Sequence, residues 1–409
     1  MKVKLPLFCA ITGAVAGMVF WLFLFAISKG TYLLWDLVPE KIPAVSFYPL
    51  IICTLGGLVI GIFRKFSGDY PESMMTVFGK LKKDGTYPYR RLPVIFIAAL
   101  LPLIFGSSVG PEAGMVGVIV ALCCWAGDNM KFAKSHAEEL SKIGAAVSLS
   151  VIFRSPMFGL FDIEDELTPD QQNNNSLTGS SKVILYCIAT GAGFGIFWLF
   201  NHVFVKVSEG FPSFDAVTAG RTDYLLFIVY LLCGILLGIF FEGSEKLFEK
   251  AGAALPPVIS ELTAGAVLGA IACFLPVIRF SGEEQMGILI TDYAKYAPLA
   301  MIGIAFLKVL VTTMCINLGL KGGHFFPLIF ASVCLGYGIS LLIFPGDPVH
   351  AAFVAAVVSA GTLGVSMKKP LAVSMLLLLC FPAQSLLWIV PSAALSAFVG
   401  KKMSKEPSR

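Results

Sequence analysis

Two glycine-containing segments that end in proline, Ser107-Ser-Val-Gly-Pro111 and Gly322-Gly-His-Phe-Phe-Pro327, have residue types suited to binding an anion through the backbone. The first amide groups of a helix have no intrahelical partner, and the helix dipole places about half a positive charge at that end. Glycine lets the backbone approach an ion closely, and proline fits the first helical turn. Helices that start at these prolines would therefore offer anion sites without Lys or Arg. For each segment alone, the alternative is a kink within an ordinary membrane helix.

Several side chains next to these segments could modulate such a site. Glu112 follows Pro111 directly, where it is either a gate that competes with the anion or an acid stabilised by the helix dipole. His324 is either a group that titrates near neutral pH or a packed histidine. Phe325 and Phe326 are either gates that act by steric exclusion and dewetting or ordinary core residues.

The elements that must position these segments are apolar runs. Of the 409 residues, 57% are hydrophobic and 14% are charged, whereas soluble proteins carry about 25% charged residues. Runs that approach the roughly 20 residues of a spanning helix lie at 5–27, 47–63, 92–105, 184–205, 224–241, 262–280, 299–318, 325–344, 351–365 and 371–399. The stretches 106–128 and 143–163 are broken by glycine and proline, and breaks at membrane depth are shielded by protein or line a cavity. The sequence therefore predicts an all-α polytopic membrane protein.

An internal repeat is also visible. Phe66-Ser-Gly-Asp69 recurs as Phe280-Ser-Gly-Glu283 in the second half of the chain. Two pairs of prolines follow in the same order and at nearly the same separation, namely Pro111 with Pro327 and Pro156 with Pro370. The shared separation predicts two homologous halves, 1–215 and 216–409.

Charge and composition argue against several classes of protein. The net charge of +4 is too small to indicate nucleic-acid binding. Ten cysteines without a CxxC pair and four scattered histidines predict neither a disulfide framework nor a metal site, and we expect no cofactor. The sequence has no HExxH and no phosphate loop ending in Gly-Lys, so we expect no enzyme. Lys and Arg crowd residues 64–91 and both ends of the chain, which predicts cytoplasmic termini.

Three motifs resemble, in order, the GSGIP, G(K/R)EGP and GxFxP motifs of CLC chloride channels and chloride/proton antiporters. They are Ser67-Gly-Asp-Tyr-Pro-Glu72 and the two segments that end at Pro111 and Pro327. The stretches 144–166 and 307–313 are also similar to that family, so the resemblance extends over nearly the whole chain. It implies an inverted repeat of tilted and broken transmembrane helices, without a soluble regulatory domain. It also implies a homodimer with one pathway per subunit, located in a bacterial inner membrane.

The resemblance assigns roles to individual residues. It implies that the backbone amides of His324 and Phe325 face a central anion, and that amides near Val109, Gly110 and Phe326 face an outer one. The family's coordinating serine falls on Gly68, or on Ser67 if one residue is inserted. Glu166 aligns with an internal proton-transfer glutamate; the alternative is a solvated acidic helix end.

Departures from the family pattern bear on the transport mechanism. The family's gating glutamate falls on Val109, which cannot carry a proton, and we expect no counterpart of the family's coordinating tyrosine. Antiporters in the family need that glutamate, whereas channels can do without it. We therefore expect a passive channel for chloride or a similar small anion in a lipid bilayer. The alternatives are a proton-coupled chloride or fluoride antiporter that uses Glu112 and Glu166, and a protein with a closed pore that serves a structural or partner-binding role.

Overall fold

The computed structural model describes residues 4–41, 47–84, 86–129, 137–153, 155–159, 161, 179–207, 212–214, 217–347 and 349–405. Within these ranges the chain is almost entirely helical, and none of these residues belongs to a β-strand. Seven helices of the described part are long and apolar enough to cross a membrane, which confirms the predicted all-α polytopic architecture. These helical stretches are Leu5–Lys41, Tyr48–Ser67, Lys182–Val203, Arg221–Ala254, Pro298–Asn317, Phe325–Ile343 and Ala383–Ser404.

The last predicted apolar run, 371–399, is two helices rather than one. The first, α16 (Pro370–Leu377), ends before Pro382, and α17 (Leu386–Lys405) begins after it. Between them, the amide of Ser385 donates to the carbonyl of Pro382 at 2.9 Å. Proline has no amide hydrogen and disfavours helical geometry in the residue before it, so Pro382 breaks a run that is apolar throughout.

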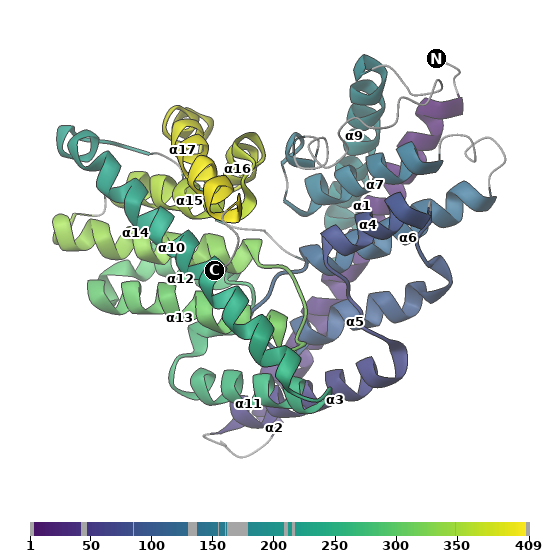
Figure 1. Ribbon diagram of the computed structural model, residues 1–409, viewed down its shortest axis with the longest axis horizontal. Coiled ribbons are helices and arrows are strands. Elements are labelled where there is room, and N and C mark those ends of the chain that lie inside the picture. The colour runs from purple at the N-terminus through teal and green to yellow at the C-terminus, as the bar shows by residue number, and fades with distance from the viewer. Residues whose placement is uncertain are drawn as a thin grey trace. The chain divides into compact units, whose positions relative to one another are not determined.

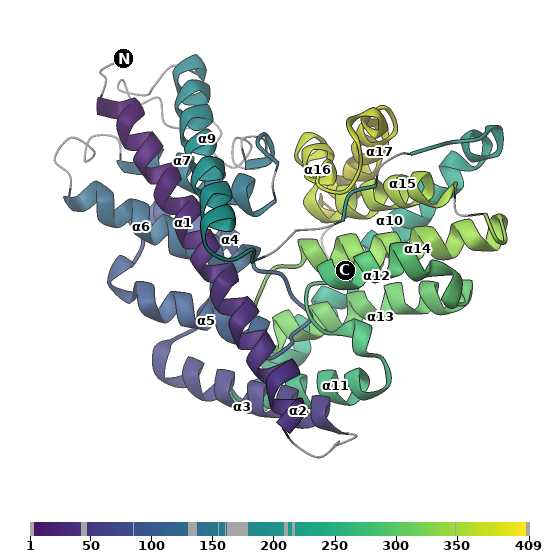
Figure 2. The same ribbon diagram turned by 180° about the vertical axis from the view of Figure 1, so that it is seen from behind.

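The chain divides into two compact units, and the first comprises Met1–Leu33, Asp69–Leu100 and Pro111–Glu209. Its helices are α1 (Lys4–Tyr32), α4 (Met74–Asp84), most of α5 (Leu92–Ile104), α6 (Glu112–Asn129), α7 (Ala137–Ile152) and α9 (Gly179–Val203). Helix α1 lies along α9 (Figures 1 and 2). A Cβ atom on Gly13 would lie only 1.9 Å from the carbonyl oxygen of Ala189. Small residues thus let the two backbones meet, as is common between membrane helices.

The second unit comprises Leu34–Gly68, Leu101–Gly110 and Gly210–Arg409. Its main helices are α3 (Tyr48–Ser67), α10 (Arg221–Ala254), α11 (Ile259–Phe274), α12 (Glu283–Asp292), α13 (Pro298–Asn317), α14 (Phe325–Ile343), α15 (Ala351–Met367), α16 and α17. Helix α15 forms the core of this unit, because every residue from Ala351 to Val365 is buried. It packs against α10, α14 and α17. The short helix α2 (Val38–Lys41) precedes α3.

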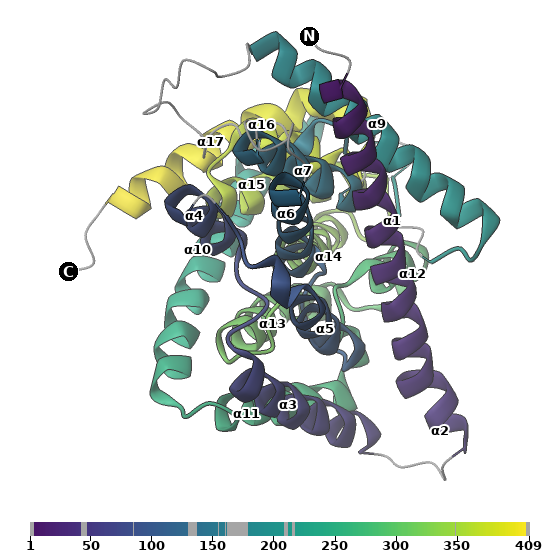
Figure 3. The ribbon, with the colours of Figure 1, turned by 90° about the vertical axis from the view of Figure 1, so that its right-hand side faces the viewer.

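Helices α3 and α11 form the closest pair in the second unit, and they lie side by side in Figures 1 and 3. Each carries two glycines one helical turn apart, Gly57 and Gly61 in α3 and Gly265 and Gly269 in α11. A Cβ atom on Gly57 would lie 2.2 Å from the carbonyl oxygen of Glu261. The spacing places both glycines on one helix face, which allows direct backbone contact.

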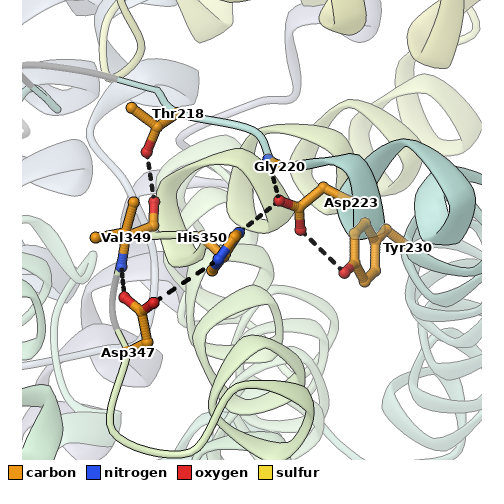
Figure 4. Close-up of polar contacts among 7 residues, drawn as sticks. All are labelled: Thr218, Gly220, Asp223, Tyr230, Asp347, Val349 and His350. Carbon is orange, nitrogen blue, oxygen red and sulfur yellow. Dashed lines mark hydrogen bonds and ion pairs between the residues drawn. The ribbon is translucent and has the colours of Figure 1, made fainter.

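A buried polar cluster joins the starts of α10 and α15 (Figure 4). Asp223 is fully buried and accepts hydrogen bonds from the Gly220 amide at 2.8 Å and the Tyr230 hydroxyl at 3.2 Å. The Nδ1 atom of His350, the residue before α15, lies 2.5 Å from the Asp223 carboxylate. Because buried carboxylates are stable only when hydrogen-bonded, this cluster holds the two helix ends together.

Candidate functional site

The segments that precede Pro111 and Pro327 meet inside the second unit. The amide of Gly110 donates to the carbonyl of Gly323, and the amide of Gly323 donates to the carbonyl of Gly110, both at 2.8 Å. The two glycines therefore form one antiparallel backbone bridge. Each stands two positions before a helix, since α6 begins at Glu112 and α14 begins at Phe325. Two broken segments from different halves of the sequence are thus brought into direct contact.

Helix α14 begins within the protein interior. Its first residues Phe325 and Phe326 are buried, as is nearly all of the helix that follows. The amide of Leu328 donates to the carbonyl of His324 at 3.0 Å, and this is the first hydrogen bond of the helix. The amides before Leu328 therefore have no acceptor within the helix. Pro327 lies in this first turn, as predicted, where its missing amide hydrogen costs no helical bond. The positive end of the α14 dipole is therefore buried rather than exposed to water.

The amides of Val109 and Gly110 already have protein acceptors. The Val109 amide donates to the carbonyl of Ser107 at 2.8 Å, and the Gly110 amide is used in the bridge to Gly323. An outer anion at these two residues would have to compete with those bonds. The resemblance did not reveal the bond of Gly110, because that bond depends on a segment in the other half of the sequence.

Val109 is fully buried against the opposite segment. A Cβ atom on Gly322 would lie 2.4 Å from Cγ2 of Val109, so the glycine leaves room for the valine side chain. The position at which the resemblance places a gating glutamate thus holds an aliphatic group in close contact with the backbone before α14. This group has no proton to exchange and no charge to compete with an anion.

One face of α13 holds the segment that leads to the bridge. Ser108 and Thr312 are both buried, and their hydroxyl oxygens lie 3.1 Å apart. Lys308, one turn before Thr312, is fully buried and donates to the carbonyls of Ile278, Arg279 and Phe280 at 3.0, 3.3 and 2.7 Å. The Phe280 amide in turn donates to the carbonyl of Gly106 at 3.2 Å. Helix α13 is therefore the scaffold of the 106–110 segment.

Neither Lys308 nor Thr312 is among the predicted site residues. A signal for Lys308 was present, because it is the single charged residue in the apolar helix Pro298–Asn317. A charged residue within a membrane helix is costly and therefore points to a function or a specific partner. Thr312 lies in the stretch 307–313 that resembles the family, but the sequence did not single it out, because a threonine in an apolar helix can bond to its own backbone instead.

His324 is packed between aromatic rings. Its ring centroid lies 4.4 Å from that of Phe325 and 5.1 Å from that of Phe241 in α10. Both neighbours present carbon rather than a hydrogen-bonding group. The geometry therefore favours the interpretation of His324 as a packed side chain beside the bridge.

The remaining predicted residues lie in different parts of the chain. Ser67 is the last residue of α3, and Gly68 ends that helix with φ of 98°, a backbone conformation that favours glycine. Glu112 is the first residue of α6 and is buried, at 3% exposure, in the first compact unit. Glu166 lies outside the described residues.

The chain is similar to transport proteins along most of its length. Residues 51–401 match the protein family described as voltage gated chloride channel. The voltage-gated ClC-type chloride channel ClcB of Shigella flexneri is 25% identical over 311 residues, which cover 72% of this chain and 70% of that protein. Chloride channel protein CLC-e of Arabidopsis thaliana is 23% identical over 337 residues, which cover 74% of this chain but 44% of the plant protein.

Solved structures share the fold. A slow cyanobacterial Cl⁻/H⁺ antiporter superposes with a TM-score of 0.81 at 15% sequence identity, over 100% of this chain and 96% of that one. A CLC-type fluoride/proton antiporter superposes with a TM-score of 0.76 at 19% identity, over 98% of this chain and 95% of that one. At these levels of identity the likeness establishes the fold alone.

Proposed function

Because the chain belongs to the voltage gated chloride channel family, we propose that it conducts chloride or a similar small anion passively across a lipid bilayer. The observation that carries this proposal is the Gly110–Gly323 bridge, which joins the broken segments ahead of α6 and α14. A dehydrated anion needs donors that replace its water, and amides at a buried helix start can supply them without a counter-charge.

The proposed central site is formed by the backbone at the start of α14. His324 and Phe325 supply amides at the positive end of the helix dipole, and Phe326 follows in the same turn. Ser67 and Gly68 line the pathway on the side where α3 ends, and Val109 and Gly110 line it on the other side. The buried surroundings strengthen these interactions, because the attraction between an ion and a dipole is larger where water is excluded.

Passive conduction is favoured over exchange by Val109. An aliphatic side chain that is buried against Gly322 can neither shuttle a proton nor swap places with the anion. The second candidate function is proton-coupled exchange of chloride or fluoride. It is favoured by the buried carboxyl of Glu112 at the start of α6, and by structural neighbours that are themselves antiporters. In that case Glu112 and Glu166 would carry the proton.

The two halves 1–215 and 216–409 are part of the same proposal. Helices α6 and α14 begin at Glu112 and Phe325. These two helix starts are separated by nearly the same length of chain as the paired sequence motifs, which supports an internal repeat. We further propose a homodimer in a bacterial inner membrane, with both termini in the cytoplasm.

Flux from liposomes tests the proposal. Purified protein is reconstituted into liposomes loaded with chloride, and chloride efflux and external pH are recorded together. A passive channel releases chloride at a rate set by its own gradient, without a proportional movement of protons. Proton uptake driven by a chloride gradient, and lost in Glu112→Gln, would establish the exchanger instead. A folded dimer that releases no chloride, fluoride or nitrate would support the closed-pore alternative.

A further inference from the structure

Arg64 lies where three segments of the second unit meet. Arg64 belongs to the last turn of α3. Its guanidinium forms an ion pair with Glu261 in the first turn of α11. The guanidinium also donates to the carbonyl of Gly319, a residue just after the end of α13, at 3.3 Å. The side chains of Arg64 and Glu261 are 18% and 3% exposed. The pair is therefore largely shielded from water, where a guanidinium and a carboxylate hold each other firmly.

Glu261 is itself held in place by the start of α11. Its second carboxylate oxygen accepts the amide of Val258 at 2.7 Å, which caps the helix. The backbone around Glu261 also contacts α3 directly, because Gly57 approaches its carbonyl oxygen. The acceptor for Arg64 is consequently fixed by both helices of the α3–α11 pair.

The turn at Gly319 is shaped to receive the guanidinium. Gly319 has φ of +104°, and a Cβ atom there would lie 2.1 Å from Nη1 of Arg64. The next residue, Leu320, donates to the carbonyl of Cys315 at 2.8 Å, and the chain then runs to Gly323 in the bridge. Arg64 therefore fixes the point at which the chain leaves α13 for the start of α14.

The backbone of Arg64 acts on the other part of the proposed site. Its carbonyl accepts the amide of Gly68 at 2.9 Å, which is the last backbone bond of α3 before the chain turns at Ser67 and Gly68. One residue thus contacts both the Ser67–Gly68 turn and the segment that leads to His324.

We propose that Arg64 is a positioning residue of the anion pathway, which holds the Ser67–Gly68 turn and the Gly319–His324 segment in register through Glu261 and the Gly319 carbonyl. This inference rests on the proposed function.

A positioning role differs from simple attraction of anions by a positive charge. Arg64→Gln removes a positive charge, whereas Glu261→Gln removes a negative one. Attraction alone predicts opposite effects of the two changes on chloride binding, whereas positioning predicts the same effect.

Chloride binding in detergent, measured by isothermal titration calorimetry, separates these possibilities. We expect Arg64→Gln and Glu261→Gln each to weaken chloride binding by roughly tenfold, and the double variant to weaken it no more than either single change. Arg64→Lys, which keeps the charge and a donor, should recover part of the loss. The matched control is Lys368→Gln, which breaks the 2.9 Å ion pair between Lys368 and Glu242 in the same unit and should leave the chloride dissociation constant unchanged.

Three results would overturn the inference: opposite effects of the two single variants, unchanged binding in both, or an equal loss in the Lys368→Gln control. If Arg64→Gln does not fold, Glu261→Gln and Arg64→Lys still provide the comparison. The proposed function is tested separately by the wild type in the same experiment. A wild type that neither binds nor moves chloride refutes that function and this inference with it, whereas a binding wild type with unchanged variants refutes this inference alone.

Discussion

At the scale of single residues, Val109 has the clearest consequence for mechanism. The side chain is buried and packs on Gly322, so the group at this position is apolar and carries no charge. In the proposed pathway, a residue that cannot ionise would make the passage of an anion independent of protons at this point. The pH dependence of transport in the wild type must then come from other groups.

Val109→Glu should make chloride flux depend on pH. A glutamate is negative above about pH 4.3, and a carboxylate at this position would compete with the anion for the same donors. Protonation removes that charge, so flux should rise as pH falls between roughly pH 7.5 and pH 4.5, because the protonated fraction of the carboxyl increases throughout this range. The measurement is chloride efflux from liposomes over this range. Val109→Gln is the control, because glutamine has nearly the same size as glutamate but does not titrate. The flux of this variant should change with pH only as that of the wild type does. A glutamate variant whose flux shows no added dependence on pH would contradict the assignment of Val109 to the pathway.

At the scale of elements, the site depends on how closely loops and helices approach one another. The 106–110 segment is bonded to the chain before α14 and supported by α13, and α3 contacts α11 through glycines. Contacts of this kind leave no space for an added methyl group, because protein interiors are close-packed.

Gly322→Ala should disturb the bridge. Its Cβ atom would lie 2.4 Å from Val109 and 3.0 Å from the carbonyl oxygen of Gly110. We expect a loss of stability of about 1–3 kcal/mol, together with reduced chloride flux, measured by thermal unfolding in detergent and by liposome efflux. Gly303→Ala in α13 is the matched control, since no atom lies within 4 Å of its added Cβ. Equal stability and flux in the two variants would show that the close approach at Gly322 is unimportant.

At the scale of the whole molecule, the distribution of charge predicts the orientation in the membrane. Lys and Arg are concentrated at 64–91 and at both ends of the chain, and positive residues are retained on the cytoplasmic side. The end of the helical stretch Leu5–Lys41, which includes Asp36 and Glu40, belongs to the opposite side if this stretch crosses once.

Reporter fusions in a bacterial host test this orientation. Green fluorescent protein fused after the last residue should fluoresce, because it folds in the cytoplasm, and alkaline phosphatase fused there should be inactive. Phosphatase fused after Lys41 is the reciprocal control and should be active, since one crossing by α1 exports it. The reverse pattern would mean that the positive residues face outward and that the proposed cytoplasmic location of the termini is wrong.

The sequence alone was sufficient for the features that depend on local pattern. The lengths of the apolar runs predicted helices that span the membrane. Pro111 and Pro327 predicted two helix starts, which the structure has at Glu112 and Phe325. The resemblance identified the family over most of the chain. A break inside an apolar run was missed at Pro382, where composition remains apolar although the backbone cannot continue.

Only the tertiary structure decided which of these local features meet. Gly110 pairs with Gly323, Lys308 reaches three carbonyls in the segment 278–280, and Arg64 reaches Gly319 from the other half of the sequence. Helical periodicity and capping act over a few residues, and they leave the pairing of distant segments open. That pairing follows from which helix faces pack together, so it also determined that the amide of Gly110 is bonded to the carbonyl of Gly323.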